Sequence, residues 1–303
     1  MRFRQHGPSL VVQAPAKLNL FLEVLGKRPD GYHELETVMV SIGLHDTLRF
    51  EPDASGGISL SCQPAGEPAA GRGEPTPSLS TGSDNLICRA AAALKESTGC
   101  SQGARIALTK RIPMEAGLGG GSSDAAATLV ALNRLWSLDL PSTELHQIAA
   151  GLGSDLNFFI DSPALAVCRG RGEQIEPVPL GRPLHLVVVR PREGLSTAAV
   201  FREWQSQASP RSSAQLLEML KRGDLGQAGT ALHNALQTPA EELSEQVRNT
   251  LRAIGSMESV GAAMSGSGTA CFAICRNGAS AHRIGARLRA QGLGRVFVVS
   301  TGL

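Results

Sequence analysis

Alternation of apolar and polar side chains predicts a β-strand in residues 13–25. Its apolar face consists of Ala14, Ala16, Leu18, Leu20, Leu22 and Val24. The opposite face consists of Lys17, Asn19, Phe21 and Glu23. Lys17 and Asn19 therefore point the same way. From the pattern alone, the simplest interpretation of Lys17 is an ordinary solvent-facing lysine.

Further periodic segments predict a mixture of strands and helices. A turn signal at Asp30-Gly31 precedes alternation over residues 32–42, which predicts a second strand and a hairpin. Residues 104–110 and the apolar run 271–275 predict two more strands. Helices are expected from residue 84 and over residues 125–136, and loops over residues 53–83 and 205–213.

A glycine-rich segment, residues 113–124, lies between the strand that Pro113 ends and the helix that starts at Ala125. Four of its residues are glycines within five positions, Gly117 to Gly121. Glycines permit positive φ and close approach of a ligand, and the first turn of a helix directs unpaired N–H groups at it. The segment therefore predicts a phosphate-binding loop, in which Ser122, Ser123 and Asp124 can cap the helix. A flexible turn before a core helix is the alternative.

This glycine segment matches neither of the commoner nucleotide motifs. The chain contains no Gly-x-x-x-x-Gly-Lys-Ser/Thr, and the glycines do not fit Gly-x-Gly-x-x-Gly. A lysine acting on the phosphates must therefore come from another segment.

Length and composition favour an enzyme that acts on small molecules. The 303 residues allow one large or two ordinary domains, and two are expected, 1–177 and 178–303. A net charge of +2 gives no field that suggests nucleic acid or an anionic membrane. The sequence has no apolar run long enough for a bilayer and no signal peptide, so we expect a cytoplasmic protein with neither a nucleic acid nor a membrane as partner.

Six cysteines are scattered without a Cys-x-x-Cys pair, which indicates neither a zinc site nor a disulfide framework. Cys271 and Cys275 share one face of the strand 271–275 and are expected to be buried free thiols rather than metal ligands.

Three ordered motifs give the chain a resemblance to a known superfamily. Residues 113–124 resemble the second motif of the GHMP kinases, and Met264-Ser265-Gly266-Ser267-Gly268-Thr269-Ala270 resembles the third. The N-terminal segments 14–22 and 30–35 resemble the GHMP kinases that phosphorylate a cytidine diphospho sugar alcohol in non-mevalonate isoprenoid biosynthesis. The resemblance implies an α+β fold with an N-terminal nucleotide-binding α/β domain and a smaller, ferredoxin-like C-terminal α+β domain.

The resemblance implies two catalytic residues. Lys17 matches the lysine beside the reacting hydroxyl and the γ-phosphate, where it stabilises charge on the transferring phosphoryl group. Asp155, in Gly153-Ser154-Asp155, matches the catalytic aspartate, which accepts or orients the proton of the substrate hydroxyl. By its residues alone, Asp155 could equally be a helix N-cap. The superfamily usually has proline where this chain has Asn157, and glycine where it has Glu115.

The remaining site residues also follow from the resemblance. ATP and Mg²⁺ are expected as nucleotide and metal, with the metal ligands and the oligomeric state left open. Residues expected to bind ATP are Pro113, Met114, Glu115, Ala116, Gly117, Leu118, Gly119, Gly120, Gly121, Ser122 and Ser123. Residues expected to bind the substrate are Asn19, Tyr32, His33, Thr197 and Phe201. Tyr32 and Phe201 are expected to stack on the cytosine, and His33 to read its edge.

Two other functions compete with this interpretation. A mevalonate- or homoserine-type kinase is the alternative within the superfamily, and the turn 30–33 together with Phe201 argues against it, because those substrates contain no base. A ligand-binding protein without catalysis is the alternative from another class. The presence of both Lys17 and Asp155 argues against it.

Overall fold

The computed structural model describes residues 1–65, 79–206 and 209–302. The chain divides into two compact units, each made of several segments. Unit 1 consists of Met1–Ala16, Leu44–Ile112 and Gly120–Ser162. Unit 2 consists of Lys17–Gly43, Pro113–Gly119 and Pro163–Leu303. The long strands β2 (Ser9–Lys27) and β3 (His33–Asp53) each pass from one unit into the other.

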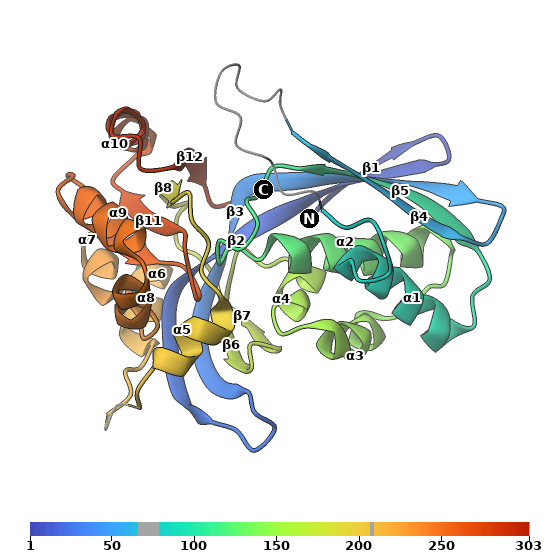
Figure 1. Cartoon of the computed structure of the whole chain (residues 1–303), viewed down its shortest axis with the longest axis horizontal. Coiled ribbons are helices and arrows are strands. Elements are labelled where there is room, and N and C mark those ends of the chain that lie inside the picture. The colour runs from blue at the N-terminus through green and yellow to red at the C-terminus, as the bar shows by residue number, and fades with distance from the viewer. Residues whose placement is uncertain (66–78, 207–208, 303) are drawn as a thin grey trace. The chain divides into compact units, whose positions relative to one another are not determined.

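Unit 1 is a sheet with helices on one face (Figure 1). Its strands follow the order β1-β2-β3-β5-β4, with β1 at Arg2–His6, β4 at Ile58–Pro64 and β5 at Gly103–Lys110. β5 runs antiparallel to β3 and parallel to β4. The helices are α1 (Leu86–Thr98), α2 (Gly120–Leu135), α3 (Ser142–Leu152) and α4 (Leu156–Asp161).

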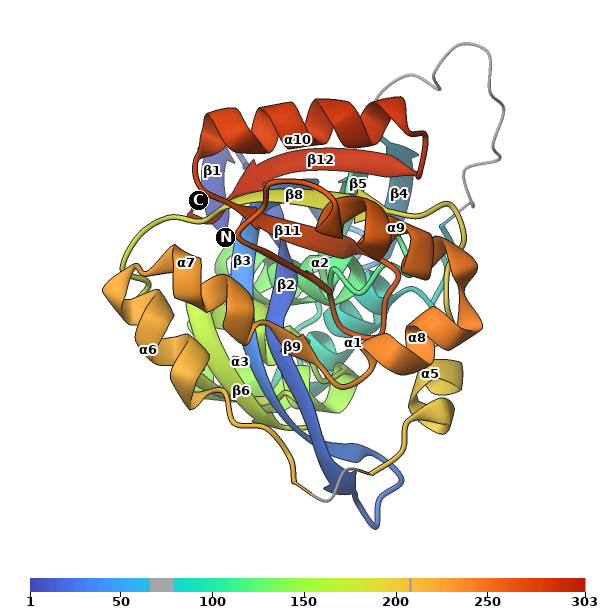
Figure 2. The ribbon, with the colours of Figure 1, turned by 90° about the vertical axis from the view of Figure 1, so that its left-hand side faces the viewer.

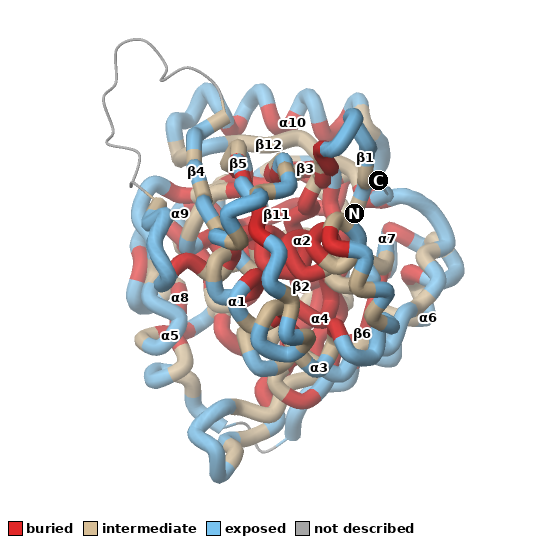
Figure 3. The backbone as a smooth tube through the Cα atoms, turned by 90° about the vertical axis from the view of Figure 1, so that its right-hand side faces the viewer, coloured by how far each residue is buried: buried red, intermediate tan, exposed pale blue. Residues whose placement is uncertain are grey.

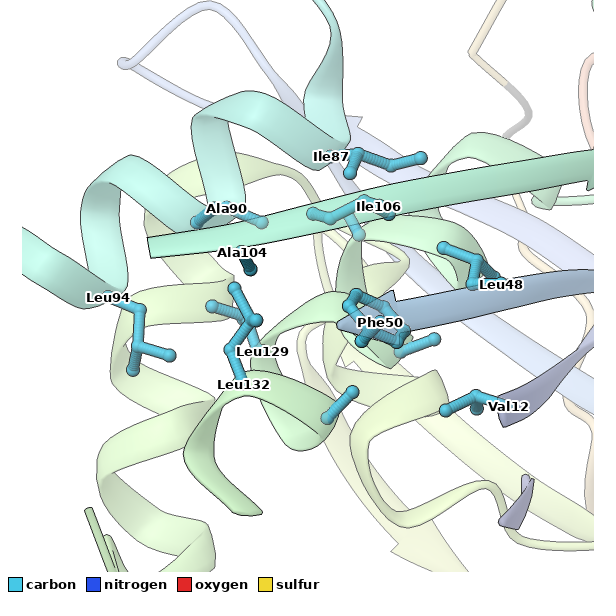
Figure 4. Close-up of a cluster of buried hydrophobic side chains, with 14 of the residues drawn as sticks. Val12, Leu48, Phe50, Ile87, Ala90, Leu94, Ala104, Ile106, Leu129 and Leu132 are labelled. Carbon is cyan, nitrogen blue, oxygen red and sulfur yellow. The ribbon is translucent and has the colours of Figure 1, made fainter. Parts of the chain in front are cut away.

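Alternation along the strands places one apolar face of this sheet against the helices. Ala104, Ile106 and Leu108 of β5 are all buried, together with Leu48 and Phe50 of β3. These side chains pack with α1 and α2 in one hydrophobic cluster (Figure 4). Small residues keep α2 close to its neighbours, and Figure 3 shows the helix as largely buried.

Unit 2 contains the rest of β2 and β3 and a second sheet. β9 (His233–Asn234) pairs with β2, while β6 (Leu165–Gly170) pairs with both β3 and β7 (Gln174–Pro177). The second sheet is antiparallel in the order β10-β11-β8-β12. Its strands are Gly261–Met264 (β10), Cys271–Cys275 (β11), His185–Arg190 (β8) and Arg295–Ser300 (β12).

Helices cover the second sheet, and α10 runs along β12 (Figure 2). The helical elements of unit 2 are α5 (Thr197–Glu203), α6 (Ala214–Arg222), α7 (Leu225–Ala228), a short 3-10 turn (Gly229–Ala231), α8 (Gln237–Leu243), α9 (Glu245–Gly255) and α10 (Gly278–Ala290). The expected α+β class is therefore confirmed, and none of the described helices is long and apolar enough to cross a membrane.

Most predicted elements are present, with differences at their ends. The strands predicted at 13–25, 104–110 and 271–275 lie within β2, β5 and β11. The helix predicted from residue 84 is α1, and the Asn85 side chain caps it by accepting a hydrogen bond from the N–H of Ile87. The second strand of the hairpin continues to Asp53, well beyond the predicted end at residue 42.

The prediction that residues 53–83 form only a loop is wrong. Residues 58–64 form β4, which adds to the edge of the sheet by parallel pairing with β5. The alternation in this segment involves mainly serine, cysteine and a few apolar residues, so its strand signal is weak. Residues 66–78 of this predicted loop lie outside the described residues. In the second predicted loop, 205–213, the described residues belong to no helix or strand.

Candidate functional site

The first part of the glycine segment, Pro113–Gly119, is a loop of unit 2 with an unusual backbone. Gly117 and Gly119 have φ of +71° and +68°, the left-handed region in which glycine is favoured. Glu115 adopts φ of +51°, where a side chain is disfavoured. This conformation gives a physical reason why glycine suits the position of Glu115. The loop is attached to β2 by the Lys17 N–H, which donates to the Leu118 carbonyl at 3.0 Å.

The second part of the segment is helical and lies in unit 1. α2 begins at Gly120, five residues before the predicted start at Ala125. Ser122, Ser123 and Asp124 therefore belong to the first turns, and the prediction that they cap the helix from outside is wrong. Ser123 is fully buried, and its hydroxyl has no hydrogen-bond partner among the described residues. A buried hydroxyl near a helix N-terminus suits a ligand oxygen.

Lys17 is buried in β2 and does not face solvent, so the interpretation as an ordinary surface lysine is wrong. Only 4% of the residue is exposed, and its ammonium donates to the Asn19 side-chain oxygen at 2.6 Å. The Asn19 amide nitrogen in turn donates to the Thr37 hydroxyl at 2.8 Å. Asn19 is itself buried, so these bonds orient it beside Lys17. A charged group this deep requires polar partners, because burial otherwise penalises it strongly.

The third motif, residues 264–270, packs on the glycine loop. The Ser265 hydroxyl donates to the Gly117 carbonyl at 3.0 Å and accepts from the Asn19 N–H at 3.1 Å. The Ala270 N–H donates to the Ala116 carbonyl at 3.0 Å. A Cβ on Gly117 would lie 2.1 Å from the Ser265 carbonyl oxygen, so only glycine fits there.

Asp155 lies in unit 1, at the position that precedes the first residue of α4. It therefore occupies the N-cap position, yet its side chain makes no capping hydrogen bond to α4. The capping interpretation does not explain why a carboxylate stands here. Asn157, where the superfamily usually has proline, is buried in the first turn of α4. Proline also suits the first turn of a helix, so the helix tolerates either residue.

Two of the residues expected to bind the substrate base meet in unit 2. The His33 ring stacks on Phe201 of α5, with centroids 4.7 Å apart and an angle of 25°. Burial, helped by the charge of Lys27, lowers the pKa of His33 below its ordinary value, so the imidazole is neutral near pH 7. Tyr32, at the hairpin turn, is 53% exposed and has the Arg171 guanidinium 4.8 Å from its ring centre.

The structure adds Trp204 to this aromatic group, which sequence reasoning missed. Its ring meets His33 edge to face, with centroids 5.7 Å apart and an angle of 81°. Thr197, another residue expected to bind substrate, lies at the start of α5. Its hydroxyl is hydrogen-bonded at 2.8 Å to the hydroxyl of Ser267 in the third motif.

A second buried lysine, also missed, supports the glycine helix from within unit 1. The Lys110 ammonium contacts the carboxylates of Asp46 and Asp124 at 2.5 and 2.7 Å. Asp46 also accepts hydrogen bonds from the backbone N–H groups of Arg111 and Ile112. A Cβ on Gly120 would lie 2.9 Å from the lysine nitrogen, which places the ammonium against the start of α2.

Charge within the Lys110 cluster follows from its burial. Desolvation raises the pKa of Asp124 to about 8; Lys110 opposes this shift, and the charge of Asp46 adds to it. Burial alone would lower the pKa of Lys110, but the charges of Asp124 and Asp46 outweigh burial and raise it. The lysine is therefore a permanent cation with two acidic partners. The sequence signal was a charged residue, Asp124, directly before the small and apolar run of residues 125–132.

Comparisons with known proteins agree with these motifs. Family models for the GHMP kinase N-terminal domain and the GHMP kinase C-terminal region match residues 85–163 and 216–293. The 4-diphosphocytidyl-2-C-methyl-D-erythritol kinase of Pelotomaculum thermopropionicum is 42% identical over 91% of this chain and 92% of its own. A crystal structure of 4-(cytidine 5'-diphospho)-2C-methyl-D-erythritol kinase superposes with a TM-score of 0.77 and 35% identity, covering 97% of this chain and all of that one.

The chain belongs to the 4-diphosphocytidyl-2-C-methyl-D-erythritol kinase family of GHMP kinases. Homoserine kinase from Cytophaga hutchinsonii shares the fold, with a TM-score of 0.73 at 18% identity over 100% of this chain and 97% of its own. The two family models lie on either side of residue 177, and a domain boundary at that residue stays a prediction.

The described residues contain no group of three or more His, Cys, Asp or Glu side chains placed to hold a metal ion. Mg²⁺ in kinases is commonly held by one or two protein groups together with the nucleotide phosphates, so it needs no such cluster. Cys271 and Cys275 are free thiols and are buried as predicted. Burial raises the pKa of both thiols, that of Cys275 to about 11.

Replacement of Lys110 should show how much the cluster stabilises this kinase. Lys110→Met leaves two buried carboxylates without their cation, so we expect the free energy of unfolding to fall by about 3–5 kcal/mol. The loss should be smaller at pH 6 than at pH 9, because protonation of Asp124 removes part of the uncompensated charge. Urea denaturation at both pH values measures it.

The control is Lys221→Met, which removes a solvent-exposed lysine whose ion pair with Glu218 spans 3.8 Å. Such pairs contribute at most about 1 kcal/mol. Equal losses in the two variants would contradict the role given to the Lys110 cluster.

Proposed function

We propose that this chain transfers the γ-phosphoryl group of ATP to the 2-hydroxyl of 4-diphosphocytidyl-2-C-methyl-D-erythritol, a step of the non-mevalonate route to isoprenoid precursors. The observation that carries the substrate assignment is the ring contact between His33 and Phe201. Both residues were assigned to the cytosine site from the sequence, although they lie far apart along the chain. The relatives named for this reaction align over about nine tenths of the chain.

The proposed reaction divides the work between two residues. Asp155 takes the proton of the substrate's 2-hydroxyl while the oxygen of that hydroxyl forms a bond to the γ-phosphorus. The bond from that phosphorus to the bridging oxygen of ADP breaks, and ADP leaves. Lys17 stabilises the charge on the transferring oxygens, which is the main contribution a protein can make to phosphoryl transfer. Asn19 supports this role by holding the lysine nitrogen at 2.6 Å.

The glycine segment is the proposed site for the phosphates of ATP. Gly117 and Gly119 have positive φ and no side chain, so a ligand can approach the loop backbone closely. The N–H groups of the first turn of α2 suit an anion. Ser122 and the buried Ser123 hydroxyl suit a phosphate oxygen or the Mg²⁺ that accompanies it. The metal supplies charge neutralisation for the phosphates when bound.

The aromatic group around His33 is the proposed site for the substrate base. Tyr32 and Phe201 offer ring faces for stacking, and neutral His33 offers one donor and one acceptor to the base edge. Thr197 and Asn19 complete the proposed substrate contacts. The similarity to homoserine kinase, at 18% identity, concerns the fold alone and does not favour that substrate. The expected cytoplasmic location stays a prediction.

A paired substitution tests the phosphate loop. Gly117→Ala places a Cβ 2.1 Å from the Ser265 carbonyl oxygen at a residue with φ of +71°, so the loop must distort. Strain of this kind costs about 1–3 kcal/mol, and we expect ATP affinity to fall about 10-fold or more. Gly151→Ala, on an open surface of α3, is the matched control and should leave ATP affinity unchanged. Calorimetry with ATP measures both; equal affinities in two folded variants would place the phosphates elsewhere.

A panel of acceptors tests the function. With Mg-ATP, the protein should release ADP with the cytidine diphospho sugar alcohol, and not with mevalonate, homoserine or galactose. The base-free 2-C-methyl-D-erythritol 4-phosphate should be inactive as well, because base stacking of about 1–3 kcal/mol is lost and the 2-hydroxyl is no longer positioned. Comparable turnover of mevalonate or homoserine would overturn the substrate assignment, and no ADP with any acceptor would overturn the kinase assignment.

A further inference from the structure

The indole of Trp204 has an unused hydrogen-bond donor. The chain has two tryptophans, and the first, Trp136, donates its ring N–H to the Gly103 carbonyl at 3.2 Å. The ring N–H of Trp204 is also shielded from solvent, yet it has no hydrogen-bond partner among the described residues. A buried donor without a partner is destabilising, and buried indoles usually find an acceptor. Packing alone therefore does not explain a tryptophan at this position.

This donor lies beside the rings assigned to the substrate base. Trp204 follows the last residue of α5, the helix that carries Phe201. Its ring touches His33 edge to face, while His33 stacks on Phe201. The imidazole thus covers one face of the Phe201 ring. The unpaired indole donor belongs to the same cluster of rings.

Described segments of unit 2 lie on both sides of Trp204 in the chain. Helix α5 precedes it, and the segment that follows is tied to the strands of the hairpin by two carboxylates. Glu23 of β2, 1% exposed, accepts the Arg211 N–H at 2.8 Å. Glu36 of β3 accepts the Ser213 N–H at 2.9 Å. The edge-to-face contact with His33 places the indole beside the first residue of β3.

We propose that Trp204 is a specificity-determining residue of the base site, and that its indole N–H donates to an acceptor atom of the substrate's cytosine. This inference rests on the proposed function. An indole can only donate, so its partner must carry a lone pair. Cytosine carries two such atoms on its pairing edge, a ring nitrogen and a carbonyl oxygen. Neutral His33 contributes one further donor, so that together the two rings can serve both acceptors.

Trp204→Phe tests the donor, because it keeps an aromatic ring and removes the N–H. CDP is the probe for the base site, and its affinity is measured by calorimetry. We expect CDP to bind about 5- to 50-fold more weakly, because an acceptor of the base is left without its donor. In steady-state assays the KM for the cytidine diphospho sugar alcohol should rise by a similar factor. The kcat and the KM for ATP should stay within about twofold of the native values.

The matched control is Glu203→Gln, an exposed neighbour that should change none of these values. A packing role for Trp204 predicts that Trp204→Phe, which keeps the ring contact, leaves both CDP affinity and KM unchanged; that result overturns the inference. Because CDP binding needs no turnover, failure of the proposed function and failure of the role of Trp204 give different results. A native protein that binds CDP but phosphorylates no cytidine substrate overturns the proposed function. Equal CDP affinity in native protein and Trp204→Phe overturns only the role of Trp204.

Discussion

Burial of the Lys17 ammonium is the constraint on which the rest of unit 2's candidate site depends. A buried cation is tolerated only with polar partners in fixed positions. Asn19 supplies one such partner, and it is itself oriented by Thr37 and by Ser265. The Ser265 hydroxyl also holds the Gly117 carbonyl. Hydrogen bonds thereby link the Lys17 side chain on β2 to β3, to the third motif and to the glycine loop. These segments are distant in the sequence, and the bonds require them to lie side by side.

Unit 1 also contains a buried lysine, but its partners are charged. Its buried lysine, Lys110, is surrounded by two carboxylates and lies against the start of α2. Opposite charges nearly cancel there, so the role of the cluster is structural. It holds the backbone that follows β5 in place next to the start of α2. Lys17 instead donates to the side-chain amide oxygen of Asn19, which carries no charge.

The sequence predicted those features that depend on local pattern. Alternation located β2 and β5, the apolar run 271–275 located β11, and the helix predicted from residue 84 is α1. Spacing also put Lys17 and Asn19 on one face of β2, which the bond between them confirms. The pattern could not tell that this face is buried, because burial depends on the elements that cover it. The polar residues on it looked like those of a solvated strand.

Features created by distant contacts escaped prediction. Asp46 and Lys110 meet only because β3 pairs with β5, and nothing near either residue signals that contact. The helix start at Gly120 was placed too late, because glycine has a low helix propensity. Trp204 gave no signal since it lies outside every motif. His33 and Phe201 were found only through the family resemblance, and their stacking was visible only in the fold.

The central claim is that the buried Lys17 ammonium serves the transition state, and the kcat of Lys17→Met at saturating concentrations of both substrates tests it most directly. Lys221→Met, which removes an exposed lysine of α6, is the reference variant. The account predicts a loss in kcat of about 100-fold or more for Lys17→Met, and no more than about twofold for Lys221→Met. A folded Lys17→Met protein with kcat close to the native value would contradict it.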